Sequence, residues 1–200
     1  MLKATRGAEV KATAEAIYQA MEGKGGLKDV FFVACGGSLA AYYSAYYLLR
    51  TESKNVDAQF MTANEFVYAT PARVNGNAVV VAMSLSGTPE TIEAAKKAKE
   101  LGATTVVLTV TKDSPLVQYG DYSWIYGSQS NDAADSDGVV DKETSGEALC
   151  LRFGFELLRL YDNYEFYDKA VDGFDKLDET CRKIAKKVRL SYGFHQNRSL

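Results

Sequence analysis

Hydroxyl residues cluster directly after an apolar run in the middle of the chain. The run, Ala78–Met83, is rich in β-branched residues and uncharged, as expected of a parallel strand buried on both faces. After it come Ser84, Leu85, Ser86, Gly87 and Thr88. Pro89 suits the first position of a helix, so we expect a helix to begin there. The open N–H groups of that helix and the three hydroxyls would supply several donors around one point, which suits a phosphate monoester.

A second loop of the same kind lies earlier in the chain. Cys35-Gly36-Gly37-Ser38 follows the predicted strand 29–34 and precedes a helix predicted over residues 39–50. Adjacent glycines let the backbone form a concave nest of N–H donors, and Ser38 occupies the expected N-cap position. Either loop alone is equally well explained as a capped strand-to-helix turn. Because both follow a strand and precede a helix, one phosphate could be bound between them.

Metal catalysis and a hydrolase triad find no support in the sequence, and Cys35 could be a reactive thiol at a helix start, although such a cysteine is more often a small buried residue. The single histidine, His195, stands in a polar tail, and no cysteine or carboxylate cluster has the spacing of metal ligands. The glycine patterns of dinucleotide-binding and P-loop proteins are absent as well, so we expect no metal and no cofactor. Glu143 and Glu147 start a long predicted helix, where either could act as a base or bind a sugar hydroxyl. Glutamates in a first helical turn more often only complement the helix dipole.

Composition limits the class of partner. The chain has 200 residues, 46% of them hydrophobic, and a net charge of −3, so a sizeable core is expected and nucleic acid is not an expected partner. No apolar stretch reaches membrane-spanning length, and the N-terminus lacks the apolar core of a signal peptide, so we expect a cytoplasmic protein without a membrane partner. Three scattered cysteines predict reduced thiols.

Strands and helices alternate along the chain. Strands are predicted over residues 29–34, 56–61, 78–83, 104–110 and 122–126. Helices are predicted over 5–21, 39–50, a short stretch after Thr62, and 91–101, with a turn over 113–116. This alternation predicts a parallel sheet with right-handed crossovers and helices on both faces, an α/β fold. Ligands of such sheets bind at the carboxyl ends of the strands, where both loops lie.

The C-terminal third differs in composition. Residues 127–141 contain several aspartates and no Lys or Arg, which predicts an acidic loop, either a plain connection or part of a pocket mouth. A long helix is predicted over 142–161, and one or two charged helices over 164–190. We therefore divide the chain into an N-terminal helix (1–28), a main domain (29–161) and a C-terminal helical segment (162–200).

The two loops together resemble those of the sugar isomerase (SIS) domain of phosphosugar-binding proteins. Cys35-Gly36-Gly37-Ser38 resembles the first phosphosugar loop of the family, and the run from Ser84 to Thr91 resembles its serine-rich phosphate loop. Residues 31–36, the Thr-Pro-Glu-Thr run and residues 113–117 are more narrowly similar to the first half of fructosamine-6-phosphate and fructoselysine-6-phosphate deglycases. The resemblance implies a three-layer αβα sandwich around a five-stranded parallel sheet, a flavodoxin-like arrangement.

The resemblance also implies ligand contacts. The residues expected to bind the phosphate or sugar are Gly37, Ser38, Ser84, Ser86 and Thr88, with the backbone at Leu85, Ser145 and Gly146 lining the sugar. One departure concerns Gly87, which directly precedes Thr88 although the family usually has one residue between them. A second concerns length, because the deglycases contain two such domains in tandem and carry their acid/base Glu and His in the second. We expect this domain to lack the acid/base pair, and we assign His195 no catalytic role.

Three functions are compatible with these residues. The first is an enzyme, a sugar-phosphate isomerase or a deglycase that splits a fructosamine 6-phosphate into sugar phosphate and amine. The second is a domain that senses a phosphosugar without converting it, and the third is a dimerisation domain. The tyrosine-rich helix predicted over residues 39–50 either contacts a second subunit or is covered by its own neighbours, and on the first interpretation we expect a homodimer or higher oligomer. The expected ligand is a sugar 6-phosphate or a fructosamine 6-phosphate.

Overall fold

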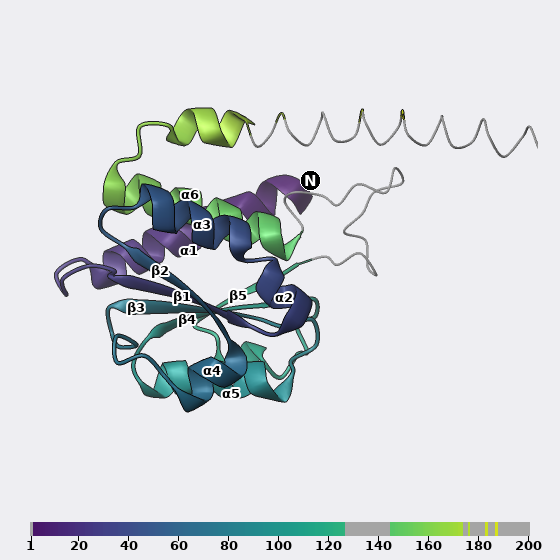
Figure 1. Ribbon diagram of the computed structural model, residues 1–200. Coiled ribbons are helices and arrows are strands. Elements are labelled where there is room, and N and C mark those ends of the chain that lie inside the picture. The colour runs from purple at the N-terminus through teal and green to yellow at the C-terminus, as the bar shows by residue number, and fades with distance from the viewer. Residues whose placement is uncertain (1, 127–144, 174–175, 177–182, 184–186, 188–200) are drawn as a thin grey trace, which may run out of the picture.

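A five-stranded parallel sheet forms the centre of the molecule (Figure 1). The computed structural model describes residues 2–126, 145–173 and the single residues 176, 183 and 187. The strands are β1 (Asp29–Ala34), β2 (Asp57–Thr62), β3 (Ala78–Met83), β4 (Thr104–Thr109) and β5 (Tyr122–Ile125). They lie in the order β2-β1-β3-β4-β5. The predicted α/β class, the strand number and the parallel direction are confirmed, and strand bounds differ from the prediction by one residue at most.

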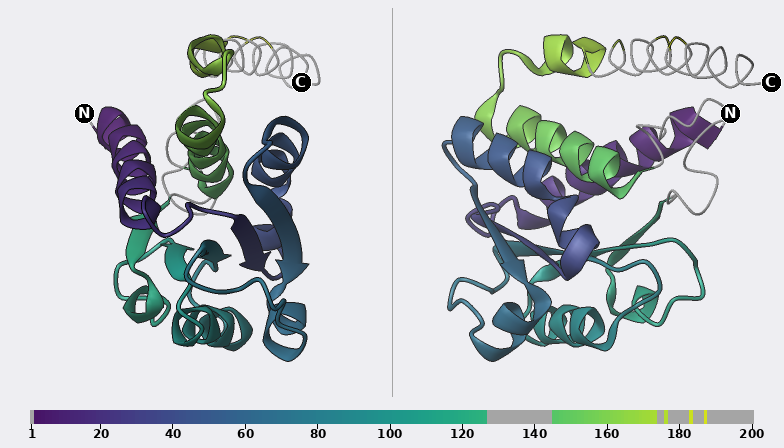
Figure 2. Two further views of the ribbon diagram at one scale, coloured as in Figure 1. Left: turned by 90° about the vertical axis from the view of Figure 1, so that its left-hand side faces the viewer. Right: turned by 45° about the vertical axis from the view of Figure 1, so that its right-hand side comes forward.

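Helices cover both faces of the sheet. Figures 1 and 2 show α1 (Leu2–Met21), α3 (Tyr43–Glu52) and α6 (Gly146–Asp162) on one face. On the other face lie α4 (Ala63–Tyr68) and α5 (Pro89–Glu100), followed after β4 by the short 3-10 helix η1 (Val117–Tyr119). The three-layer αβα sandwich is therefore as predicted. A further short helix, α2 (Gly36–Ala40), stands at the carboxyl edge of the sheet.

The central strands are apolar because both of their faces are covered. All six residues of β1 and all six of β3 are buried. In register, Ala34 lies beside Met83 of β3 and beside Thr62 of β2, so the carboxyl ends of these strands are level. Level strand ends bring the loops that follow them to one edge of the sheet.

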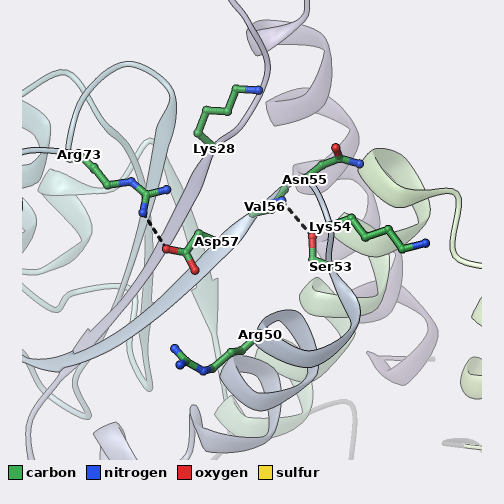
Figure 3. Close-up of a pocket in the computed structure, with 8 residues that line it drawn as sticks. All are labelled: Lys28, Arg50, Ser53, Lys54, Asn55, Val56, Asp57 and Arg73. Atoms are coloured by element: carbon green, nitrogen blue, oxygen red, sulfur yellow. Dashed lines mark hydrogen bonds and ion pairs between the residues drawn. The ribbon is translucent and has the colours of Figure 1, made fainter.

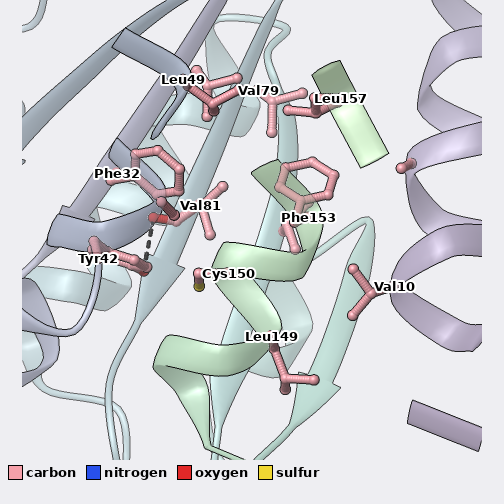
Figure 4. Packing of buried hydrophobic residues seen from close by; sticks show 14 of the residues in the cluster. Val10, Phe32, Tyr42, Leu49, Val79, Val81, Leu149, Cys150, Phe153 and Leu157 are labelled. Atoms are coloured by element: carbon pink, nitrogen blue, oxygen red, sulfur yellow. Dashed lines mark hydrogen bonds between the residues drawn. The ribbon is translucent and has the colours of Figure 1, made fainter. Parts of the chain in front are cut away.

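The larger core cluster lies between the sheet and the layer of α1, α3 and α6 (Figure 4). Phe32 of β1 packs against Tyr42, with ring centroids 5.1 Å apart, and Phe153 of α6 packs against Trp124 of β5 at 5.3 Å. The Tyr42 hydroxyl donates a 2.9 Å hydrogen bond to the Val81 carbonyl, which satisfies a polar group in this apolar region. Burial raises the pKa of Tyr42 well above its usual value, so it stays a neutral donor.

The helix predicted over residues 39–50 is in fact two helices. Helix α2 ends at Ala40 and α3 begins at Tyr43, so the prediction of one helix is wrong. The break lies next to Tyr42, whose side chain is fully buried and donates to the sheet. A short helix at the strand end, separated from α3, allows Tyr42 to reach the core while residues 36–40 stay at the sheet edge.

Helix α6 begins at Gly146, four residues later than predicted, because the extended Ser145 is its N-cap, and its end agrees with the prediction within one residue. This helix ends at Asp162, and Asn163 adopts a left-handed conformation with φ of 49°, a common way to end a helix. Residues 167–173 are helical, in agreement with the predicted C-terminal helix. The predicted acidic loop 127–141 lies outside the described residues, as does most of the segment after residue 173.

Asp121 links the start of β5 to β4, and its contribution to the free energy of unfolding should depend on pH. Burial opposes its ionisation, but hydrogen bonds from the Thr105 N–H (2.9 Å) and the Lys99 ammonium (2.9 Å) outweigh it and hold its pKa below the usual value. A lowered native pKa means that the carboxylate stabilises the fold above its unfolded pKa of about 3.9, and that this contribution disappears as pH falls through the native pKa.

We therefore expect Asp121→Asn to lower the free energy of unfolding at pH 7 by about 1 kcal/mol, a modest figure because the site is partly exposed. Urea unfolding between pH 7 and pH 2 would measure it. The difference between variant and wild type should shrink as the pH falls below about 4. A difference that stays constant over this range would show that the charge of Asp121 is not the cause.

Candidate functional site

The strand order reverses between β1 and β3. The chain passes from β1 outwards to β2 and then returns to pair β3 on the other side of β1. The loops that follow these two neighbouring strands therefore leave in opposite directions, and this is the position at which ligands usually bind in open parallel sheets. These are the two loops that the sequence singled out.

The loop after β1 presents open backbone. Cys35 is the N-cap of α2 and makes no side-chain capping bond, and Gly36 has φ of 55°. No heavy atom lies within 4 Å of a Cβ atom built at Gly36 or at Gly37. The side-chain positions of both glycines thus face open space beside the first turn of α2, and a ligand oxygen could approach the backbone there, as the predicted nest requires.

Ser38 lies within the first turn of α2 and not at its start, where the sequence predicted it. The structure places Cys35 at the N-cap and Ser38 inside α2, so the N-cap prediction for Ser38 is wrong. Because Gly36 adopts a positive φ, the chain turns into the helix immediately after Cys35. Ser38 is half-buried, and its predicted contact with a ligand stays a prediction.

In the loop after β3, Ser84 holds the backbone together. Its side chain is nearly buried, at 4% exposure, and its Oγ accepts hydrogen bonds from the N–H groups of Gly87 (3.1 Å) and Thr88 (2.9 Å). The acceptor capacity of this hydroxyl is thus used inside the protein, while its O–H proton remains to be donated. Ser84 closes the turn and so shapes the loop itself.

Leu85 and Ser86 form the outer part of this loop. The Leu85 carbonyl accepts from the Val110 N–H (3.2 Å) and the Thr109 hydroxyl (2.9 Å), which ties the loop to the end of β4. Ser86 is exposed, and within the described part of the chain neither its hydroxyl nor its N–H has a hydrogen-bond partner. Ser86 is therefore the serine of this loop whose donors are most available to a ligand.

Thr88 begins helix α5. It is the N-cap residue, and its hydroxyl exchanges a 2.9 Å hydrogen bond with the Thr91 hydroxyl. Pro89 occupies the first turn as predicted. Gly87 has φ of 88°, and a Cβ atom there would lie 3.0 Å from Ser114 Oγ, so this position requires glycine in the turn as it stands. The shortened loop is thus closed without a clash.

The start of α6 meets the same edge of the sheet. Ser145 is its N-cap and accepts a 3.1 Å hydrogen bond from the Ala148 N–H. Gly146 is buried so closely that an added Cβ atom would lie 2.6 Å from Met83 Sδ and 3.5 Å from Tyr126 Cδ2. Because Met83 directly precedes Ser84, the start of α6 lies beside the serine loop. Glu143, the weak candidate for a catalytic base, lies outside the described residues.

Tyr126, which the sequence reasoning did not single out, lies where these segments meet. It follows β5, is 7% exposed and contacts the Gly146 position. Burial raises its pKa, and an interaction with the Ser38 hydroxyl acts in the opposite direction. The tyrosine is thus a neutral phenol between the loop after β1 and the start of α6. Only its position at a strand end could have pointed to it in the sequence.

The described residues supply binding groups to this edge without an evident acid/base pair. No cluster of three His, Cys, Asp or Glu residues suited to a metal ion occurs among the residues that the structure describes. Within the same residues, no helix is long and apolar enough to cross a membrane. The edge offers neutral donors, from hydroxyls and backbone N–H groups, of the kind that hold a phosphate or sugar.

Comparison with known proteins agrees with this geometry. The SIS domain profile matches residues 27–135. Fructosamine deglycase FrlB of Bacillus subtilis is 32% identical over 181 residues, which are 90% of this chain and 52% of that protein. A crystal structure from Salmonella typhimurium, assigned as a phosphosugar isomerase, superposes with a TM-score of 0.77 at 32% identity and covers 87% of this chain and 50% of that one.

A regulator is also similar to part of the chain. An HTH-type transcriptional regulator of Haemophilus influenzae is 39% identical over 96 residues, 48% of this chain and 31% of that protein. The chain thus spans about half the length of its deglycase relative and less of the regulator. The profile match covers more than half of the chain and includes both loops at the sheet edge. The chain belongs to the SIS domain family, with a phosphosugar isomerase-like fold and a sequence similar to that of fructosamine deglycase.

Proposed function

We propose that the chain binds a sugar 6-phosphate at the carboxyl edge of β1 and β3, as part of a fructosamine-6-phosphate deglycase or a related sugar-phosphate isomerase. The observation that carries the proposal is the meeting of the loop after β1, the loop after β3 and the start of α6 at one edge. Similarity to fructosamine deglycase FrlB over 90% of the chain supports the choice of substrate class.

The proposed binding mode follows from which donors are open. The N–H groups of Gly37 and Ser38 and the donors of Ser86 surround the phosphate, while Ser84 and Thr88 hold the loop in shape. The backbone at Leu85, Ser145 and Gly146 lines the sugar. In a deglycase reaction a general base enolises the fructosamine, and the C–N bond then breaks to release the amine. We place that acid/base pair outside the described residues.

The proposed domain boundaries follow from this role. Residues 29–161 form the SIS domain, residues 1–28 an N-terminal helix, and residues 162–200 a helical segment that leads towards a second SIS domain. The proposed protein is cytoplasmic and assembles as a homodimer or larger oligomer, which places two such domains together. Assays should therefore include both this chain and a longer form with a second SIS domain.

Turnover of a fructosamine 6-phosphate tests the enzyme. We expect the longer form to release glucose 6-phosphate and free amine, and this chain to bind the phosphosugar. A second candidate, a sensing domain, is favoured by the similarity to the HTH-type regulator. If both forms bind the substrate and neither converts it, the sensing role replaces the enzyme.

Ser86→Ala tests the site itself. The exposed Ser86 hydroxyl has no partner among the described residues, so its loss should leave the fold intact and remove one donor to the anion. A hydrogen bond to a charged group contributes about 1.5 to 3 kcal/mol, so the dissociation constant for glucose 6-phosphate should rise by about tenfold or more. Calorimetric titration measures this change, with Ser123→Ala in β5 as the control. An unchanged affinity would remove Ser86 from the site.

A further inference from the structure

A second concave site lies at the opposite edge of the sheet, where β1 and β2 begin (Figure 3). It has a volume of about 300 Å³. Its lining residues are Lys28, Arg50, Ser53, Lys54, Asn55, Val56, Asp57 and Arg73. We call it the amino-edge pocket. Strand β1 separates it from the loops of the phosphosugar site by about 20 Å, the length of six extended residues.

The lining is basic although the chain as a whole has a net charge of −3. Four lining residues are cationic and one is anionic. Counting also the two carboxylates just behind the wall, Asp29 and Asp162, the group still carries one more positive than negative charge. This region is therefore positive although the whole chain is negative, and such a local positive charge favours an anionic ligand.

The carboxylates of this region are already bound by other groups. Arg73 forms ion pairs with Asp29 (2.7 Å) and Asp57 (2.8 Å), which join the first residues of β1 and β2. Figure 3 shows this arginine reaching Asp57, with Lys28 on one side of the pair and Arg50 on the other. Neither Lys28 nor Arg50 forms an ion pair within the part of the chain that the structure describes. Their charges remain available.

The wall opposite Arg73 is held rigidly. Asp162, the last residue of α6, accepts hydrogen bonds from the Ser53 hydroxyl (2.5 Å), the Lys54 N–H (2.9 Å) and the Asn55 side-chain amide (2.9 Å). The loop between α3 and β2 is therefore fixed before any ligand arrives, which reduces the entropy lost on binding. Arg50 lies over the Tyr46 ring, with its Cζ atom 5.9 Å from the ring centroid, and this contact limits its movement.

We propose that the amino-edge pocket binds a small phosphate-bearing anion, as a second site independent of the phosphosugar loops. The planar Arg50 guanidinium donates to phosphate oxygens, and Lys28 contributes a second positive charge. The volume accommodates inorganic phosphate, pyrophosphate or a phosphate ester of a small molecule. The site provides a place where phosphate level could act on the protein without competition at the phosphosugar loops.

The test uses titration calorimetry with inorganic phosphate, pyrophosphate and glucose 6-phosphate at low salt. The variant is Lys28→Gln with Arg50→Gln, both exposed, and the charge-matched control is Lys11→Gln with Lys169→Gln, which are exposed as well. Because two charges are lost, we expect phosphate or pyrophosphate to bind about tenfold more weakly to the variant and unchanged to the control. The compound that binds most tightly shows whether the pocket prefers free phosphate, pyrophosphate or a phosphate ester.

Three results would overturn the proposal. Phosphate affinity could fall equally in variant and control, which would indicate an effect of general surface charge, or it could change in neither. Ser86→Ala could also abolish all phosphate binding. The last comparison also separates the two sites, because Ser86→Ala should weaken binding at the carboxyl edge and leave phosphate binding at the amino-edge pocket unchanged. Failure of the amino-edge pocket thus leaves the proposed function untouched, and failure of the phosphosugar site leaves the pocket testable. Thermal unfolding of each variant confirms that it is folded.

Discussion

Gly146→Ala is expected to destabilise the protein and to weaken phosphosugar binding, although it adds a single methyl group. That methyl would lie 2.6 Å from Met83 Sδ and 3.5 Å from Tyr126 Cδ2. Met83 is 1% exposed, so its side chain cannot swing out into solvent and any movement must repack the core around it. Overpacking of this kind costs about 1 to 3 kcal/mol, and we expect a loss of that size in the free energy of unfolding, measured with urea.

The effect on binding has the same origin. Any shift of Met83 is transmitted to Ser84, the next residue, and so to the loop that it closes. The matched control is Gly173→Ala, because a Cβ atom at Gly173 meets no heavy atom within 4 Å. Alanine there should be neutral, or stabilising by up to about 1 kcal/mol through helix propensity. If both variants behave alike, the close contact at Gly146 does not constrain the site.

Ser84→Ala is expected to affect stability and binding together. It removes the acceptor of the Gly87 and Thr88 N–H groups at a position that is 4% exposed. Because Gly87 is half-buried and Thr88 is exposed, the two N–H groups regain water in part, and the free energy of unfolding should fall by about 1 kcal/mol, the net contribution of an ordinary hydrogen bond. Because the loop loses its closing bonds, its N–H groups are no longer held for the ligand, and affinity for glucose 6-phosphate should fall as well.

Comparison with Ser86→Ala makes this prediction specific. Ser86 is exposed and has no hydrogen-bond partner among the described residues, so its replacement should weaken binding without changing the urea midpoint. Ser84→Ala should change both. A Ser84→Ala protein with wild-type stability would show that the turn closes without this hydroxyl, and the division of roles between the two serines would then be incorrect.

The sheet was predictable because its strands are buried on both faces. Runs such as Ala78–Met83 are apolar throughout and short, and the helices between them have one apolar face, so periodicity alone indicated a parallel α/β fold. The division of residues 39–50 into two helices was not predictable. It depends on Tyr42 reaching the Val81 carbonyl of a strand that is distant in the sequence, and local propensity contains no information about that contact.

The location of the site was predictable from the sequence, but the contacts of its individual residues were not. Strand-to-helix loops with glycine and hydroxyl residues indicated the edge, and the reversal of strand order brings both loops there. The sequence could not distinguish a serine that closes the turn, Ser84, from one that faces outwards, Ser86. Nor did it point to Tyr126, whose position depends on how β5 and α6 end beside the loop after β1.

The central position of β1 also affects how the chain acquires its structure. This strand is the first to be synthesised, yet its partners β2 and β3 both come later in the chain. Until β3 has emerged from the ribosome, one edge of β1 stays unpaired, with an apolar sequence that favours pairing with other chains. Parallel pairing over long sequence separations is also slow. Chains interrupted before Ala78 should therefore aggregate, and expression of intact protein should improve at low temperature or with chaperones.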